Sequence, residues 1–197
     1  LHHGIVEHFQ GQEKYAGEYV LNDHAAVSKL LAAYNVRLVF TGHYHSEDIT
    51  VKRSPQANKF VFDIETGSLV TYPSPYRLVS ITISQKVIVQ TRHVTSIRTH
   101  PDDFSEYSLA YTESGIAQIA AGVIRGFGIG PAEAENIGQQ AARAFIAHYA
   151  GDESLPAGQE AINTHGLSLL GRIIVTFRRG FIEALWQDLP PPDNNIT

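Results

Sequence analysis

The chain of 197 residues has a net charge of −5, no cysteine, and 43% hydrophobic against 18% charged residues. This composition is typical of a packed protein and excludes a disordered chain, disulfides and thiolate metal ligands. No apolar run approaches the ~18 residues that a membrane helix needs, and no charged and then apolar leader opens the sequence. We therefore expect neither a membrane span nor a signal peptide within it.

The charge is distributed unevenly along the chain. Residues 1–100 hold ten lysines and arginines against eight acidic residues, whereas residues 101–197 hold five against twelve. An acidic second half matches the phosphate backbone of a nucleic acid poorly, and the sequence contains no basic stripe. We therefore expect no nucleic acid among the partners.

Residues 1–100 have the pattern of an α/β fold. The segment Leu1–Phe9 begins apolar and runs into histidines, which predicts the end of a strand. Asn22 and Asp23 are good helix N-caps, and apolar residues at helical spacing follow them. The β-branched run Val36–Thr41 then predicts a buried strand, so this stretch is most of a βαβ unit.

Two hairpins are predicted next. Strands at Asp48–Arg53 and Lys59–Glu65 flank residues 54–58, whose composition is typical of a turn. Strands at Arg77–Ile83 and Lys86–His93 alternate apolar and polar residues around a short turn, which predicts an antiparallel pair with one buried face.

The composition changes at residues 99–103 from β-branched to alanine-rich, which predicts a domain boundary. A helix is expected over 104–125, a second from Pro131 to Gly151, and a third over 170–185. The apolar stripe expected to bury the first of these helices consists of Phe104, Tyr107, Tyr111, Ile116, Ile119 and Val123. The sequence thus predicts an α/β (α+β) protein, with a sheet-containing domain at 1–100 and a small helical bundle at 101–197.

Histidines follow two of the predicted strands. His2 and His3 lie at the exit of the first, and Gly42-His43-Tyr44-His45 lies at the exit of the second. Ligands collect at the carboxyl ends of strands in open α/β sheets, so the two groups are expected to converge. Gly42 would let the backbone turn sharply, and Tyr44, on an extended segment, is expected to face away from the histidines and to be a packing residue. Neutral imidazole suits Zn, Fe, Mn or Ni, so the pattern predicts a metal site.

The spacing of these motifs resembles the last two motifs of the calcineurin-like metallophosphoesterases, in the bacterial branch related to cyclic-nucleotide phosphodiesterases. The run Glu65–Pro73 resembles the strand and turn that follow there, and the resemblance covers residues 1–95. It implies a two-sheet α/β sandwich and a dinuclear centre of Fe, Mn or Zn. His2 and His43 would bind one metal and His45 the other, while His3 is a candidate phosphate contact. The substrate would be a small phosphoester or a cyclic nucleotide.

The upstream motifs of that family, Asp-x-His, Gly-Asp-x-x-Asp and Gly-Asn-His-Asp/Glu, do not occur in the chain. We interpret the sequence as the C-terminal part of such an enzyme, inactive alone and completed by an N-terminal segment. The alternative is a non-catalytic fragment that serves as a scaffold or binding module with an incomplete metal site. A weaker third hypothesis is a mononuclear hydrolase with histidine ligands from this chain only.

Other polar residues give weaker patterns. Arg53 and Arg77 are candidate phosphate contacts, but we expect them to be solvated strand ends. Ser68 lies in a turn without a base that would activate it. The remaining histidines considered are expected at the surface or on helices without partners: His24, His93, His100, His148 and His165.

Overall fold

β3 (Phe60–Glu65) is the central strand of the first sheet. It pairs parallel with β1 (Leu38–Thr41) and antiparallel with β2 (Asp48–Arg53). These three strands confirm the sequence prediction in a computed structural model that describes residues 1–54, 58–151 and 153–196. The turn predicted over 54–58 includes residues 55–57, which lie outside the described residues.

Three short helical elements precede β1: α1 (Gln12–Ala16), the 3-10 helix η1 (Gly17–Tyr19) and α2 (His24–Ala33). α2 packs on the first sheet through a small apolar core formed by Ile5, Ala32, Val39 and Val61. The predicted helix at α2 is therefore confirmed. Asp23 is its N-cap residue but makes no side-chain cap hydrogen bond, because its backbone is left-handed with φ 56°.

The second sheet has the order β4-β5-β6, with β4 (Pro75–Ile81), β5 (Val87–His93) and the two-residue β6 (Asn195–Ile196) all antiparallel. The predicted hairpin is confirmed, and β6 is a strand that the sequence did not predict. The expected buried face is found only in part, since Val89 and Thr91 on β5 are buried whereas most of β4 is exposed. Val89 packs against Ile49 and Ile64 of the first sheet, so the two sheets share a core.

The second half of the chain forms α3 (Phe104–Gly126), α4 (Pro131–Ala150) and α5 (Leu169–Ala184), as the periodicity predicted. Pro131 occupies the first turn of α4, where its missing N–H costs no hydrogen bond. α3 packs closely on α4 at Gly138, where an added Cβ would lie 2.5 Å from the Ala117 carbonyl oxygen.

The apolar stripe predicted to bury α3 is wrong for most of its length. Tyr111 and Ile119 are 64% and 72% exposed, whereas Ala121 and Ile124 face the helical core. A helix with apolar residues on two faces does not specify which face is buried, and here the small residues fit the close approach to α4.

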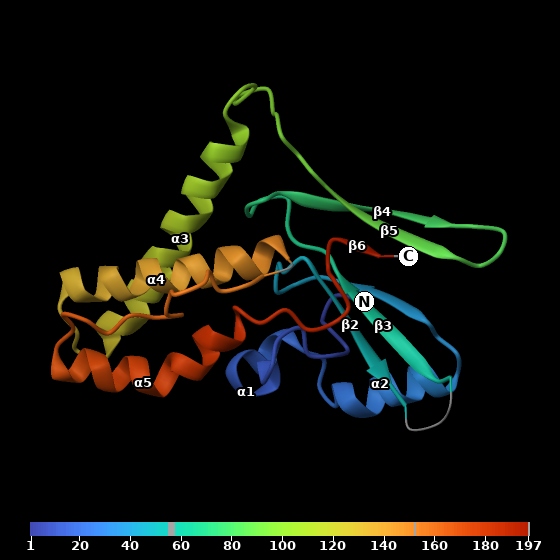
Figure 1. Cartoon of the computed structure of the whole chain (residues 1–197), viewed down its shortest axis with the longest axis horizontal. Helices are drawn as coiled ribbons and strands as arrows, with labels where there is room; N and C mark the ends of the chain where they lie inside the picture. The colour runs from blue at the N-terminus through green and yellow to red at the C-terminus, as the bar shows by residue number, and fades with distance from the viewer. Residues whose placement is uncertain (55–57, 152, 197) are drawn as a thin grey trace.

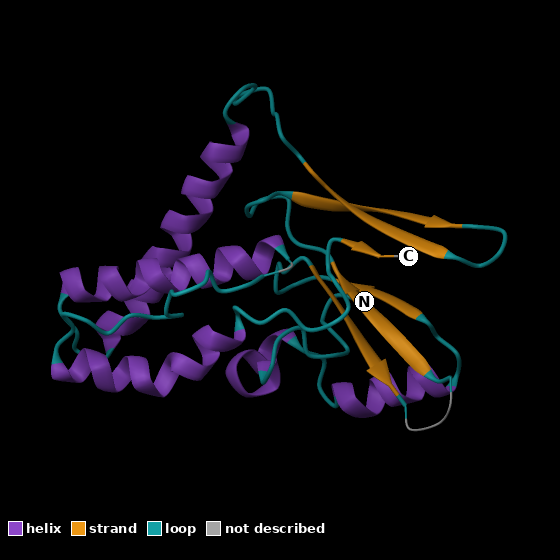
Figure 2. Ribbon diagram, viewed as in Figure 1, coloured by secondary structure: helices purple, strands orange, loops and turns teal. Residues whose placement is uncertain are grey.

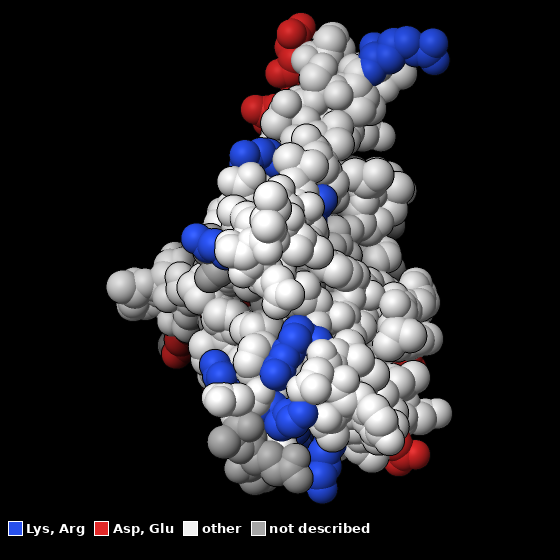
Figure 3. Space-filling view, turned by 90° about the vertical axis from the view of Figure 1, so that its right-hand side faces the viewer, with Lys and Arg blue, Asp and Glu red and all other residues white. Residues whose placement is uncertain are grey.

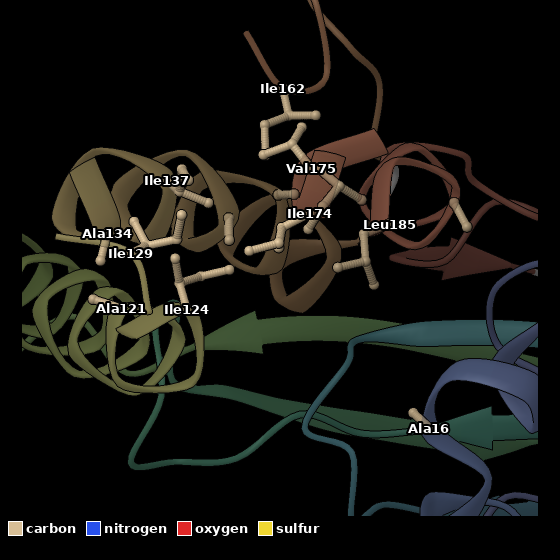
Figure 4. Packing of buried hydrophobic residues seen from close by; sticks show 14 of the residues in the cluster. Ala16, Ala121, Ile124, Ile129, Ala134, Ile137, Ile162, Ile174, Val175 and Leu185 are labelled. Carbon is tan, nitrogen blue, oxygen red and sulfur yellow. The ribbon is translucent and has the colours of Figure 1, made fainter. Parts of the chain in front are cut away.

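The largest core joins the three helices to the start of the chain. Ile124 of α3, Ile137 of α4 and Ile174 of α5 meet within it (Figure 4). Phe9 and Tyr44 belong to the same cluster. The sheets lie on one side of the molecule and α3, α4 and α5 on the other (Figures 1 and 2). Within the described residues, the α+β class is thus built from two three-stranded sheets and five α-helices.

None of the helices in the described part of the chain combines the length and the apolar character needed to cross a bilayer. On the face shown in Figure 3, lysine and arginine side chains form separate groups divided by uncharged surface.

Candidate metal centre

The imidazole rings of His2, His3 and His43 lie together. The ring centroids are 4.4 Å apart for His2 and His43, 4.3 Å for His3 and His43, and 5.3 Å for His2 and His3. His45 is near enough to His2 for the two rings to interact electrostatically. We call these four residues the histidine cluster. We expected from the sequence that His2 and His3 would converge with His43 and His45, and in the structure both pairs lie at the end of β1.

Backbone hydrogen bonds hold the first residues beside β1. The amino group of Leu1 donates to the carbonyl of Phe40 at 3.0 Å, and the Gly42 N–H donates to the carbonyl of His2 at 3.1 Å. The expected strand end over Leu1–Phe9 is nevertheless wrong, because no strand forms there. The chain turns away instead, and the Leu21 N–H donates to the Gly4 carbonyl.

The Gly42–His45 loop turns at its histidines and not at its glycine. His43 has φ 82° and His45 has φ 70°, both in the left-handed region, whereas Gly42 does not. Such a conformation costs on the order of 1 kcal/mol for a non-glycine residue and is concentrated at functional sites. Tyr44, between them, is buried against Phe9 and Tyr19, as expected for a packing residue, but it does not lie on an extended strand.

Both loop histidines favour the neutral imidazole that binds metals. Burial lowers the pKa of His43, and the neighbouring rings of His3, His2 and His45 lower it further. Burial and the ring of His2 likewise lower the pKa of His45. A metal ion binds the unprotonated nitrogen, so these surroundings reduce the competition from protons.

The cluster fits only part of a dinuclear centre. No group of three or more His, Asp or Glu side chains in the described ranges is arranged so that it could hold a metal ion. The imidazole rings of the histidine cluster lie close together. The carboxylates of Asp48, Asp63 and Glu65, however, contact a different histidine, His8. The chain therefore offers imidazole ligands, and within the described residues it offers no carboxylate that bridges two ions.

Two carboxylates of β3 fix the segments that carry the histidine cluster. Asp63 accepts hydrogen bonds from the backbone N–H groups of Ile5 at 2.6 Å and Val6 at 3.1 Å. Glu65, two residues on and on the same face of the strand, accepts from the Tyr44 N–H at 3.0 Å. One side of the central strand thus positions both loops.

His8, which the sequence analysis did not single out, joins these carboxylates. It is fully buried, with Nδ1 3.4 Å from Asp48 Oδ2, and Nε2 3.3 Å from Asp63 Oδ2 and 3.4 Å from Glu65 Oε2. These contacts are ion pairs rather than aligned hydrogen bonds. We call these four residues the His8 network. The sequence did contain a sign of this buried network. Two acidic residues, Asp63 and Glu65, occupy alternate positions of the otherwise apolar strand Phe60–Glu65.

The charges of the His8 network depend on one another. Burial by itself would lower the pKa of His8, but Asp63, Glu65 and Asp48 raise it well above its ordinary value. Burial opposes ionisation of Asp63, yet His8 and the hydrogen-bond donors around Asp63 lower its pKa. Burial raises the pKa of Glu65 to about 8, although His8 opposes the change. At neutral pH we therefore assign a cationic His8, an anionic Asp63 and a largely protonated Glu65.

A second buried ion pair connects the two sheets. Arg77 Nε lies 2.8 Å from Glu47 Oε1, and Arg77 also donates to the carbonyls of Glu65 and Asp193. The expectation of a solvated Arg77 is therefore wrong. Glu47 also accepts from the Gly67 N–H, and a Cβ on Gly67 would meet the His45 carbonyl oxygen at 3.0 Å. The same Cβ would lie 2.7 Å from Pro75 Cγ, so glycine fits there because the backbone passes between Pro75 and the histidine loop.

The remaining sequence candidates have structural roles. His148 was expected to lack a partner, but it is fully buried with Nδ1 2.6 Å from Glu153 Oε1. His24 and His100 also have carboxylate partners, Glu13 at 3.5 Å and Asp103 at 3.2 Å. The Ser68 hydroxyl accepts a hydrogen bond from the Val70 N–H within a turn. His93 and His165 are exposed as expected.

No protein-family model matches the sequence, and a search of curated proteins found no significant similarity. The interpretation of the histidine cluster therefore depends on its geometry and on the motifs described above.

Proposed function

We propose that the histidine cluster is part of the active site of a metal-dependent phosphoesterase of the calcineurin-like type. In this proposal His2, His43 and His45 are ligands of a dinuclear Fe, Mn or Zn centre, and His3 contacts the phosphate. The remaining ligands, including a bridging carboxylate, come from protein residues that precede these 197. The two sheets are then the C-terminal part of a two-sheet sandwich.

The observation that carries the proposal is the convergence of two segments forty residues apart on one point at the end of β1, with ring centroids 4.3–5.3 Å apart. Packing alone does not call for this arrangement, because His2 and His3 are not in the apolar core and two histidines hold left-handed backbone conformations. Lowered pKa values at His43 and His45 favour the unprotonated ligand.

Two metal ions bound in such a site polarise phosphoryl oxygens and lower the pKa of a bound water, which supplies hydroxide at neutral pH. The part played by this chain is positional. Asp63 and Glu65 hold the two histidine segments through backbone hydrogen bonds. Because these anchors lie on the central strand, the imidazoles have fixed positions relative to the sheet.

The proposal is tested by comparing the 197-residue chain with the same chain extended at its N terminus by its natural preceding residues. Hydrolysis of bis(p-nitrophenyl) phosphate is followed by absorbance, and metal content is measured in parallel. We expect the short chain to be inactive and the extended protein to turn over the substrate. His43→Ala or His45→Ala in the extended protein should remove most of the turnover and part of the bound metal.

His165→Ala is the matched control, because this side chain is exposed, whereas His148 is buried and its loss would disturb the core. Activity of the short chain, or activity of the extended protein that survives loss of His43 and His45, contradicts the proposal. An extended protein that folds and binds metal but hydrolyses no phosphoester would favour the scaffold or binding-module alternative. That alternative is supported by the incomplete ligand set within the described residues.

A further inference from the structure

A cavity of about 330 Å³ opens beside the histidine cluster, and His43 and His45 form part of its wall. The rest of its described lining comes from α1, η1, α4 and α5: Tyr15, Ala16, Glu18, Tyr19, Phe145, Tyr149 and Phe181, together with Tyr44. We call it the aromatic cavity. A larger hollow of about 850 Å³ lies along α3 and α4, but none of the histidine cluster contributes to its described lining.

Aromatic side chains line the cavity from the histidines toward α1, α4 and α5. The ring of Tyr19 lies 5.0 Å from that of His43, and the ring of Tyr149 lies 6.3 Å from that of His45. The ring centroids of Phe181 on α5 and Tyr15 on α1 are 5.4 Å apart. In Figure 1, α1 lies beside the end of α5. The Gly42–His45 loop therefore provides the histidine end of the cavity, α1 and η1 provide four residues of its wall, and α4 and α5 provide three.

The lining has little charge and several accessible π-faces. Among its described residues only Glu18 carries a formal charge at neutral pH apart from the titratable histidines. Tyr15, Tyr19, Phe145, Tyr149 and Phe181 are half-buried, so part of each ring faces the opening. Burial, with the nearby Tyr19 and Glu65, raises the pKa of Tyr149 to about 12, so its hydroxyl remains an uncharged donor.

This chemistry recognises a planar ring. Aromatic side chains bind planar groups by offset stacking and edge contacts, with little dependence on which ring is bound. The volume lies at the lower end of the range for small-molecule sites, which suits one ring system with a short attachment. A long apolar chain would have fewer specific contacts with these rings.

We propose that the aromatic cavity binds the aromatic ring of a phosphoester, a nucleobase or a simple aryl group, whose phosphate lies at His43 and His45. The position of the phosphate depends on the function proposed above. Binding of the ring depends on the cavity alone. The helical part of the chain therefore selects the substrate, in addition to packing against the sheets.

The test is a binding titration of the metal-free 197-residue chain, followed by NMR with ¹³C-labelled tyrosine and phenylalanine rings. The probes are phenyl phosphate, adenosine 5′-monophosphate and methyl phosphate at the same pH and ionic strength. We expect methyl phosphate to bind at least ten-fold more weakly than one of the two ring-bearing probes. Tyr149→Leu and Phe181→Leu should each weaken binding of that probe by about two- to ten-fold, the range expected for one aromatic contact.

Two further variants separate ring contact from fold. Tyr149→Phe keeps the ring and should retain binding, while Tyr34→Leu, at a tyrosine 78% exposed and outside the cavity, should change nothing. Thermal unfolding by circular dichroism checks that each variant is folded. Stronger binding of adenosine 5′-monophosphate identifies a nucleobase, and stronger binding of phenyl phosphate identifies an aryl group.

Equal binding of methyl phosphate, no binding of either ring-bearing probe, or ring binding that neither cavity variant weakens would overturn the proposal. The result is independent of the phosphoesterase assignment, because the titration requires neither metal nor turnover. A chain that binds rings but never hydrolyses a phosphoester in its extended form would leave this site in place and contradict only the reaction.

Discussion

Replacing His8 by leucine removes the cationic member of a fully buried group of charges and leaves a side chain of similar size. His8 contacts Asp48, Asp63 and Glu65 at 3.3–3.4 Å. At this distance one ion pair in an effective dielectric constant of about 20 is worth roughly 5 kcal/mol before desolvation is subtracted. Loss of one partner from a buried pair costs about 3–5 kcal/mol in measured cases, because the other charge stays buried.

We therefore expect His8→Leu to lower the free energy of unfolding by about 3–5 kcal/mol at pH 6, measured by urea denaturation. For a chain of this length, that loss corresponds to a fall in melting temperature of roughly 6–20 °C. The same substitution at the exposed His165 is the control and should stay within about 0.5 kcal/mol.

The pH dependence provides a second check on the same variant. Because the folded-state pKa of His8 is raised, its stabilising contribution is fully present below the unfolded value near 6.5 and is lost as the pH rises through the folded value. The cost of His8→Leu should accordingly shrink at alkaline pH. A cost below about 1 kcal/mol at pH 6 would refute the charges assigned to the His8 network.

Two further predictions concern stability. The folded-state pKa of Glu65 is raised from 4.5 to about 8, so the folded state holds the proton more tightly and stability should fall as the pH rises between these values. Glu65→Gln should flatten that decline in urea midpoints measured across the range, and an unchanged slope would contradict the assignment. Gly138→Ala should destabilise the protein by about 1–3 kcal/mol, because its Cβ would press on the backbone of α3. Gly115→Ala on the open side of α3 should raise stability by about 0.4–1 kcal/mol, and equal effects at the two glycines would refute the close packing of α3 on α4.

Secondary structure was predictable because its causes are local. Pro131 at the first turn of α4, the β-branched residues of β1 and the alternation along β5 each act over a few neighbouring residues. The Gly42–His45 motif was also visible, since it is short and follows the apolar strand β1, whereas the strand expected before His2 and His3 does not form. The expected convergence was found, but backbone hydrogen bonds that hold the irregular first residues beside β1 bring it about, and not a pair of neighbouring strand ends.

The choice of buried face on α3 was not local. Tyr111 and Ala121 lie on different faces of one helix, and either face could cover a core. What decides between them is Gly138 on α4, which lets the small residues approach closely. That contact joins positions about twenty residues apart. It depends on the distance between the backbones of α3 and α4, which the spacing of apolar residues in the sequence does not reveal.

The sequence by itself determined the four longer helices, the two hairpins and the convergence of His2, His3, His43 and His45, but not α1, η1 or β6. Only the tertiary structure decided that His8 would be buried among carboxylates 40 to 57 residues away, and that aromatic rings of α4 and α5 would wall a cavity beside the histidines. The physical reason is that a charge or a ring has the same local propensity whether it is buried or solvated. The free energy of burying such a side chain depends on the partner that the fold brings beside it, and that partner also decides the role of the side chain.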